Sequence, residues 1–190
     1  YIFHAAAYKH VGLLENNVSA AVNNNILGTI AVINVAIKNN IEKFVLISTD
    51  KAVNPSNIMG ATKKISEIII QDICNKNNNG NTNFSIVRFG NVIGSTGSVV
   101  PIFYDQIINH GEVTVTDRNV TRYFMTIKEA VMLVLNASII SKGGEIFLLN
   151  MGNPVNIFEL AKKMIWLSGF DILDDNKNDK GIRIKFTGLK

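Results

Sequence analysis

The stretch FVLISTDK, residues 44–51, joins an unbroken apolar run to a group of polar side chains. A short apolar run of this kind is typical of a strand that is buried on both faces of a parallel sheet. The polar residues begin where the strand is expected to end, and they are Ser48, Thr49, Asp50 and Lys51. Because the carboxyl ends of the strands border the ligand crevice of an open α/β sheet, we expect these four residues to line a site.

A helix is expected to follow this strand and to bring a second lysine close to the end of the strand. Pro55 and Asn57 break the chain first, and Met59 and Lys63 then stand four residues apart on one helical face. This layout is similar to the Ser and Tyr-x-x-x-Lys arrangement of short-chain dehydrogenases, with Met59 in the place of the tyrosine. A thioether has no proton to give or take, so Met59 cannot act as a general base. We therefore expect Asp50 and Lys51 to be the acid–base residues.

Segments of strand and helix type alternate along the chain. We expect strands over residues 1–6, 43–48, 84–89 and 145–150, helices over 20–39, 58–75, 99–109, 127–140 and 157–168, and short extended pieces over 113–116 and 123–126. Alternation of this type predicts an α/β fold in which crossover helices connect the strands of a parallel sheet.

Residues 1–94 and 95–190 are expected to have different roles. The first segment is interpreted as the C-terminal part of a Rossmann-like, doubly wound NAD(P)-binding domain, and the second mainly as a smaller substrate-binding lobe. Residues 145–150 belong either to that lobe or to the main sheet. Such a domain usually opens with a strand, a Gly-rich turn and a helix that receives the pyrophosphate. No G-x-x-G-x-x-G stretch occurs here, so we expect the N-terminal strands to lie outside this sequence.

Composition restricts the class of partner. The 190 residues, 47% of them hydrophobic, are enough for one well-buried domain. The net charge is +4, but the lysines are scattered and no basic stripe with interleaved aromatic residues is present. We therefore expect no nucleic-acid partner, and an anionic small ligand accounts for the charge. The single Cys74 excludes an internal disulfide. No apolar run approaches roughly 18 residues, so we expect these residues to make no membrane contact.

Four segments together resemble the bacterial polysaccharide-biosynthesis branch of the extended short-chain dehydrogenase/reductase superfamily. They are HAAAYKHV (4–11), STDKAVNPSNIMGATK (48–63), RFGNVIGSTGSVVP (88–101) and TRYFMTIKEA (121–130). Members of this branch include UDP-N-acetylglucosamine 4,6-dehydratases, and the methionine form resembles the long, membrane-anchored members. The resemblance implies a cytoplasmic domain, held at the inner membrane by upstream segments in a long parent protein, with a homo-oligomer left open.

The resemblance also implies the roles of individual residues. NAD or NADP is the implied cofactor, contacted by Ala5, Ala6, Ala7, Asn25, Ser48 and Lys63. A UDP-sugar is the implied substrate, contacted by Lys9, Asn91, Ser98, Val99 and Arg122. The implied catalytic residues are Thr49, Asp50, Lys51 and Lys63, and no metal is expected. Exposed N–H groups before a helix at residue 99 and the planar guanidinium of Arg122 both suit phosphate oxygens, although Arg122 could equally form an ion pair between lobes.

A 4,6-dehydration needs two proton-handling groups besides the redox cofactor. Oxidation at carbon 4 of the sugar makes the proton on carbon 5 acidic, and the hydroxyl on carbon 6 can then be eliminated. By resemblance, Lys51 is the base at carbon 5 and Asp50 the acid at carbon 6. The proton of the carbon 4 hydroxyl goes to Asp50 or to a water held by Thr49 and Lys63.

Two other functions stay open at this point. A nucleotide-sugar 4-epimerase or reductase would share the fold and the cofactor, but it would rely on the tyrosine that Met59 replaces. A non-catalytic dinucleotide-binding module would tolerate that loss, but it would have no reason to keep Thr49, Asp50, Lys51 and Lys63 together. We expect these 190 residues by themselves to be inactive, because they lack a pyrophosphate loop.

Overall fold

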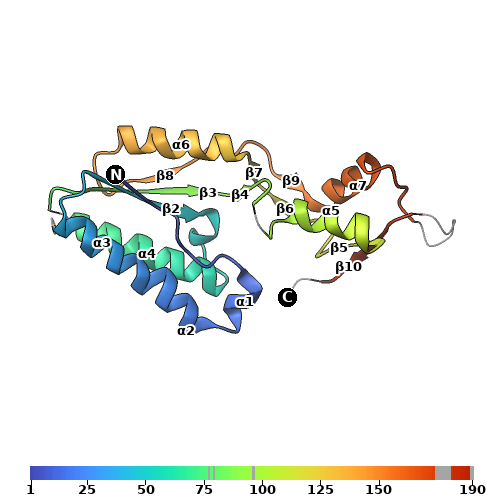
Figure 1. Ribbon diagram of the computed structural model, residues 1–190, viewed down its shortest axis with the longest axis horizontal. Helices are drawn as coiled ribbons and strands as arrows, with labels where there is room; N and C mark the ends of the chain where they lie inside the picture. The colour runs from blue at the N-terminus through green and yellow to red at the C-terminus, as the bar shows by residue number, and fades with distance from the viewer. Residues whose placement is uncertain (77, 79, 96, 174–180, 189–190) are drawn as a thin grey trace. The chain divides into compact units, whose positions relative to one another are not determined.

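The computed structural model describes residues 1–76, 78, 80–95, 97–173 and 181–188 (Figure 1). The chain divides into two compact units. Unit 1 comprises Tyr1–Gly90 and Lys128–Asn150, and unit 2 comprises Asn91–Ile127 and Met151–Lys190. The sequence predicted a boundary near residue 94 and left open a return to the main sheet at residues 145–150; in the structure residues 128–150 belong to the first unit.

Unit 1 is built on a parallel sheet. Among the described residues its four strands are β1 (Ile2–His4), β2 (Lys43–Thr49), β3 (Asn83–Phe89) and β8 (Ile146–Leu148), in that spatial order. The apolar run of β2 is buried on both faces, and its core neighbours include Phe84 and Ile86 of β3. The pairing places Ser48 opposite Arg88, so the polar ends of β2 and β3 lie side by side.

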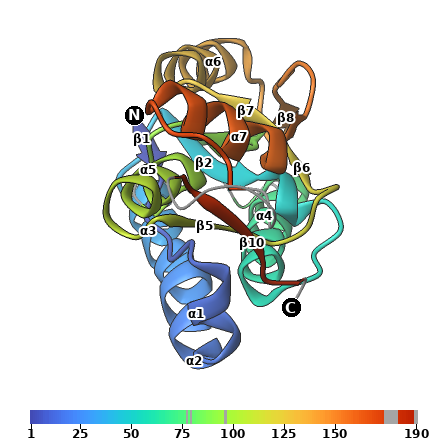
Figure 2. The ribbon, with the colours of Figure 1, turned by 90° about the vertical axis from the view of Figure 1, so that its right-hand side faces the viewer.

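Helices cover both faces of this sheet, as Figures 1 and 2 show. On one face lie α4 (Ile58–Asn75) and α3 (Gly28–Lys38), and on the other lies α6 (Ile127–Ile140). The long helix that contains α3 begins with α2 (Val18–Ala21) and passes through a π-helical turn, η1 (Val22–Leu27). The first turn of α4 is capped by Asn57, whose side chain accepts a hydrogen bond from the backbone N–H of Gly60 at 2.8 Å.

The expectation of no membrane-length apolar segment needs correction. The helix Val18–Lys38 is long and apolar enough to cross a bilayer by length and composition, since it carries no charged side chain before Lys38. This is weak evidence, because a helix that packs against a sheet passes the same test. Here the buried residues Ile33 and Ala36 of this helix belong to the core of unit 1.

Unit 2 is a smaller layer of helices and short strands. A parallel pair, β5 (Glu112–Val115) and β10 (Arg183–Phe186), packs with α5 (Val99–Asn109) and α7 (Ile157–Leu167) around a core that includes Phe103 and Ile165. The remaining short strands are β4 (Asn91–Val92) with β7 (Phe124–Met125), and β6 (Thr121–Arg122) with β9 (Val155–Asn156).

Candidate active site

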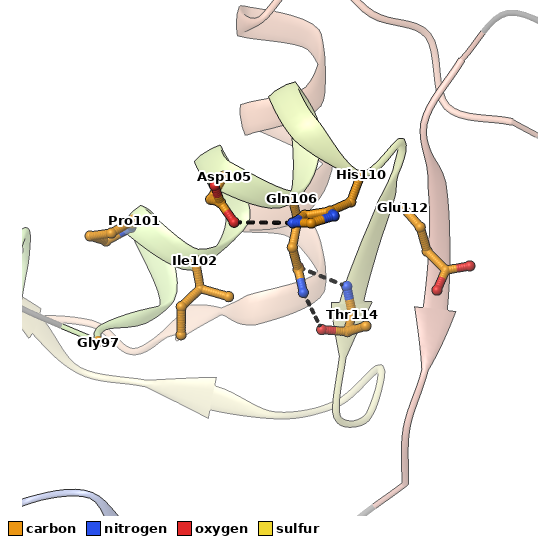
Figure 3. A pocket seen from close by; sticks show the side chains of 8 residues that line it. All are labelled: Gly97, Pro101, Ile102, Asp105, Gln106, His110, Glu112 and Thr114. Carbon is orange, nitrogen blue, oxygen red and sulfur yellow. Dashed lines mark hydrogen bonds and ion pairs between the residues drawn. The ribbon is translucent and has the colours of Figure 1, made fainter.

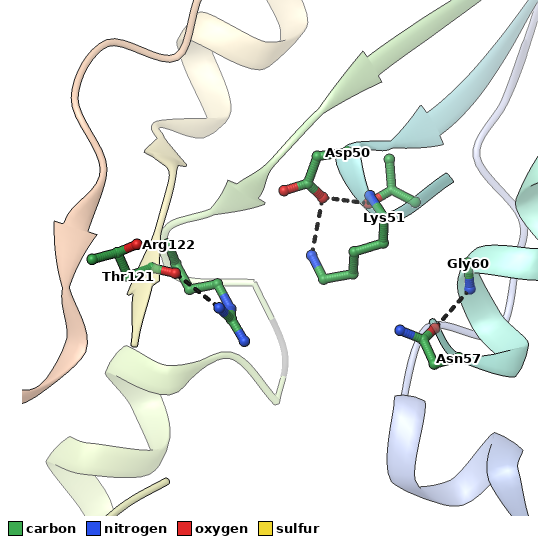
Figure 4. A network of polar contacts seen from close by, with 7 residues as sticks. Asp50, Lys51, Asn57, Gly60, Thr121 and Arg122 are labelled. Carbon is green, nitrogen blue, oxygen red and sulfur yellow. Dashed lines mark hydrogen bonds and ion pairs between the residues drawn. The ribbon is translucent and has the colours of Figure 1, made fainter. Parts of the chain in front are cut away.

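Thr49, Asp50 and Lys51 lie together at the carboxyl end of β2. Thr49 is the last residue of the strand and the cap of a short 3-10 helix, η2 (Asp50–Ala52). Its hydroxyl donates to Asp50 Oδ1 at 2.9 Å, and the Lys51 ammonium contacts the same oxygen at 3.1 Å (Figure 4). The Asp50 and Lys51 side chains are 27% and 28% exposed, so solvent or a ligand can reach the pair.

Met59 is a packing residue in unit 1. Its side chain is 6% exposed and belongs to an apolar cluster with Leu14, from α1 (Val11–Glu15), and Ala21. The next residue, Gly60, brings the start of α4 against η2, because a Cβ there would lie 2.5 Å from the Lys51 carbonyl oxygen. The helix that carries Lys63 is thereby held close to the end of β2.

Lys63 lies one turn further along α4 and is almost completely buried, with 6% exposure. Burial lowers the pKa of its ammonium to about 8, against the opposing effect of the Glu67 carboxylate. Within the described ranges its ammonium makes no hydrogen bond to another residue. Burial and then the Lys63 charge lower the pKa of His4, whose ring lies 2.9 Å from the Thr29 hydroxyl. An almost buried ammonium without a hydrogen bond suits a ligand with hydroxyl or anionic groups.

Asn25 connects the segment after β1 to α4. Its buried side chain accepts from the backbone N–H of Tyr8 at 2.7 Å and donates to the Tyr8 carbonyl at 3.1 Å and to the Thr62 hydroxyl at 3.0 Å. Asn25 lies in the π-helical turn, where its own carbonyl accepts from the hydroxyls of Thr29 and Ser66. Just before Tyr8, Ala5 and Ala6 are exposed and Ala7 is partly exposed.

Ser48 is buried behind the strand end, in a group that the sequence analysis did not predict. Its hydroxyl donates to Glu67 Oε1 at 2.5 Å, and the same fully buried carboxylate accepts from Arg88 Nε at 2.8 Å and from Arg88 Nη2. The sequence did contain one indication of this group: Glu67 stands four residues after Lys63, so both lie on one helical face. The side chains of Ser48 and Asn25 are both buried and hydrogen-bonded to protein groups, and the cofactor contacts expected of them stay predictions.

The substrate candidates are divided between the two units. Lys9 is exposed in unit 1, whereas Asn91, Ser98, Val99 and Arg122 belong to unit 2. Arg122 is exposed and donates to the Thr121 carbonyl at 2.8 Å (Figure 4). Ser98 is the N-cap of α5, and its buried hydroxyl has no hydrogen-bond partner among the described residues. These positions leave Ser98 and Arg122 with polar groups that a ligand of unit 2 could use.

Unit 2 also contains an open pocket of about 730 Å³, which the sequence analysis did not predict (Figure 3). Asp105 and His110 face each other across 3.3 Å, and the Gln106 amide is held by the hydroxyl and the backbone N–H of Thr114. The part of the chain that the structure describes contains no cluster of His, Cys, Asp or Glu suited to a metal ion. The pocket is lined by Gly97, Pro101, Ile102, Asp105, Gln106, His110, Glu112 and Thr114.

The family described as "Polysaccharide biosynthesis protein" matches the sequence over residues 1–190. The chain belongs to this family. The capsular polysaccharide biosynthesis protein CapD of Staphylococcus aureus is 53% identical over 189 residues, which are 100% of this chain and 30% of CapD. A UDP-glucose 4-epimerase of Rickettsia rickettsii is 38% identical over 190 residues, which are 100% of this chain and 52% of that protein. The chain therefore spans about a third to a half of the length of these relatives.

Solved structures confirm the fold class that was predicted for this family member. Pen from Bacillus thuringiensis superposes with a TM-score of 0.90 at 40% identity, over 100% of this chain and 55% of Pen. DesIV, a dTDP-glucose 4,6-dehydratase from Streptomyces venezuelae solved with NAD, has a TM-score of 0.81 at 19% identity over 98% of this chain and 64% of DesIV. The second likeness shows the α/β fold alone.

Proposed function

We propose that these residues form part of an NAD(P)-dependent enzyme that modifies a nucleotide sugar, and specifically a UDP-N-acetylglucosamine 4,6-dehydratase. The observation that carries the proposal is the accessible Asp50–Lys51 pair at the end of β2, with Met59 packed where a tyrosine base would stand. A dehydration needs two proton-transferring groups besides the redox cofactor, and Asp50 and Lys51 can supply them. The identity to CapD, a capsular polysaccharide biosynthesis protein, supports a role in glycan synthesis.

The residues of unit 1 fit a dinucleotide cofactor. When bound, NAD(P) would supply the hydride acceptor and donor for the two redox steps. Lys63 offers an almost buried ammonium with no hydrogen-bond partner among the described residues, and exposed Ala5 and Ala6 permit close approach of a ligand to the backbone after β1. Asn25 holds that backbone segment in place through Tyr8.

The Asp50–Lys51 contact provides a route by which the two residues reach the protonation states that elimination requires. As an ion pair, Asp50 lacks the proton that a general acid gives, and Lys51 carries the proton that a general base must lose. Transfer of one proton across the 3.1 Å contact turns the pair into a neutral acid and a neutral amine.

Each residue of the pair can then act on the sugar. The Lys51 amine takes the proton from carbon 5, and the Asp50 carboxylic acid protonates the departing hydroxyl of carbon 6. Thr49 orients Asp50 through its 2.9 Å hydrogen bond. Met59 has no ionisable proton, so two routes remain for the proton of the carbon 4 hydroxyl. It goes to a water held by Thr49 and Lys63 when Asp50 has already been protonated by Lys51. Alternatively it goes to the Asp50 carboxylate, which then passes it to the departing hydroxyl, and Lys51 loses its own proton to water instead.

The 4-epimerase alternative is favoured by one observation, the 38% identity to the Rickettsia rickettsii UDP-glucose 4-epimerase. Epimerisation at carbon 4 changes no atom count in the sugar, whereas dehydration removes one water. The mass of the product therefore separates the two reactions.

The test is incubation of the natural full-length protein with UDP-N-acetylglucosamine, followed by mass spectrometry of the product. A product lighter by one water, formed without net consumption of NAD, is the expected result. An unchanged mass with a new sugar epimer would establish the epimerase instead. Absence of any product, with the cofactor bound, would leave the non-catalytic module.

A further inference from the structure

We propose that Glu67 is a positioning residue of the candidate site, whose buried carboxylate ties the ends of β2 and β3 to α4 and places a negative charge one helical turn from Lys63. This proposal rests on the proposed function, because that function makes the site an active site. Its test, however, does not require that function. It assigns a task to a residue that none of the predicted roles covers.

The first step in the argument is the set of contacts that Glu67 makes. Its side chain is fully buried, and its two oxygens accept from the Ser48 hydroxyl at 2.5 Å and from Arg88 Nε at 2.8 Å and Nη2. The Lys64 ammonium lies 3.9 Å away. One carboxylate thus joins three elements, because Glu67 belongs to α4, Ser48 to β2 and Arg88 to β3.

The second step is the position of these partners next to the candidate site. Ser48 directly precedes Thr49, so the hydrogen bond to Glu67 holds the strand at the point where η2 begins. Glu67 stands one helical turn after Lys63, and its charge acts against the burial that lowers the pKa of that lysine. Glu67 itself is shielded from any ligand, so it acts through its neighbours.

The third step is the cost of the arrangement. A fully buried carboxylate is expensive to desolvate, and replacing such an ion pair by apolar residues is often neutral or stabilising. A buried pair is therefore weak evidence for a purely stabilising role. Its place behind the candidate site, one turn from an almost buried lysine, supports a role in positioning instead.

The test measures the protonation of Lys63 directly, by competitive acetylation with trace acetic anhydride across pH and peptide mass spectrometry. The protein is the natural full-length chain, and Lys76, which is 63% exposed and pairs with Asp72 rather than Glu67, is the internal reference. Lys63 of the wild type should react with a midpoint near pH 8. In Glu67→Gln the midpoint should fall by about one pH unit, whereas Glu67→Asp, which keeps the charge, should stay close to the wild type.

The charged groups on the elements around Lys63 are His4 on β1, Glu15 on α1, the Asp50–Lys51 pair on η2, Lys64, Glu67 and Asp72 on α4, and Arg88 on β3. Loss of the Glu67 charge would leave the Arg88 guanidinium, which is 13% exposed, without its partner, and this can prevent folding. The double variant Glu67→Gln/Arg88→Gln removes both charges. Its Lys63 midpoint should fall by less than in Glu67→Gln, because losing the Arg88 cation opposes the effect of losing the Glu67 anion. An unchanged midpoint in a folded Glu67→Gln or double variant would overturn the proposal.

This readout needs no substrate, so it separates the positioning role from the proposed function. A shifted midpoint together with a wild-type protein that forms no dehydrated sugar would retain the positioning role and reject the dehydratase. If the wild type forms the dehydrated sugar but the Lys63 midpoint does not change in Glu67→Gln, the dehydratase is retained and the positioning role is rejected.

Discussion

The backbone of Gly60 lies directly against the carbonyl of Lys51, so closely that a Cβ on Gly60 would be 2.5 Å from that oxygen. This contact sets the distance between the start of α4 and the η2 turn that carries Asp50 and Lys51. Backbone, rather than a flexible side chain, occupies the space, so a methyl group can be accommodated only by moving one of the two elements.

Gly60→Ala should therefore destabilise the protein by about 1–3 kcal/mol and should lower turnover more than stability alone explains. The matched control is Gly12→Ala on α1, where an added Cβ meets nothing within 4 Å. Thermal unfolding and turnover of UDP-N-acetylglucosamine measure the two effects. Equal behaviour of the two variants would show that the close approach at Gly60 does not matter.

Asp50→Asn and Lys51→Met should each reduce dehydration by about 10²- to 10⁴-fold, because each removes a group that transfers a proton. Binding of NAD(P) should persist, since neither side chain belongs to the segment after β1. The control is Lys76→Met, which breaks the exposed ion pair of Lys76 with Asp72 at 2.8 Å. Unchanged turnover in Asp50→Asn and Lys51→Met would rule out the proposed mechanism.

Asn25→Ala should cost about 1–3 kcal/mol of unfolding free energy, because it leaves buried polar groups of Tyr8 and Thr62 without a partner. It should also weaken cofactor binding by loosening the segment 5–8. Asn23→Ala is the control, since Asn23 is exposed in the same π-helical turn. Chemical denaturation and calorimetric titration with NAD provide the measurements.

Cofactor affinity should fall as the pH rises through about 8. Burial lowers the pKa of Lys63 to about 8, so the ammonium is charged below this pH and neutral above it. A neutral amine is a weaker donor to a hydroxyl or anionic group, so affinity for NAD should be lost above pH 8. Calorimetric titrations from pH 6.5 to 9.5 should show this slope in the wild type and in Lys64→Met, but a flat response in Lys63→Met.

Met59→Leu should retain most of the wild-type turnover and cost less than about 1.5 kcal/mol, because it preserves the volume of an apolar side chain beside Leu14 and Ala21. Initial-rate measurements with the full-length protein check this expectation. A large loss of turnover with intact folding would assign Met59 a chemical role that packing does not explain.

Much of unit 1 could be predicted from local sequence. The apolar run of β2 and the polar residues after it identified the sheet edge. The helices at 58–75 and 127–140 have the predicted bounds, and so does the helix at 99–109 in unit 2. These segments have strong apolar periodicity that agrees with their packing. The helix α1 and the strand β10 were missed, since each is short and its pattern is not distinctive.

The sequence by itself determined the alternation of strands and helices, and with it the position of Thr49, Asp50 and Lys51 at a strand end. Hydrophobic periodicity is a local property, so it can be read without the fold. Only the tertiary structure decided that Glu67 meets Ser48 and Arg88, 19 and 21 residues away. That contact depends on the register of β2 with β3 and on the packing of α4 across them, which are non-local and leave no periodic trace in the chain.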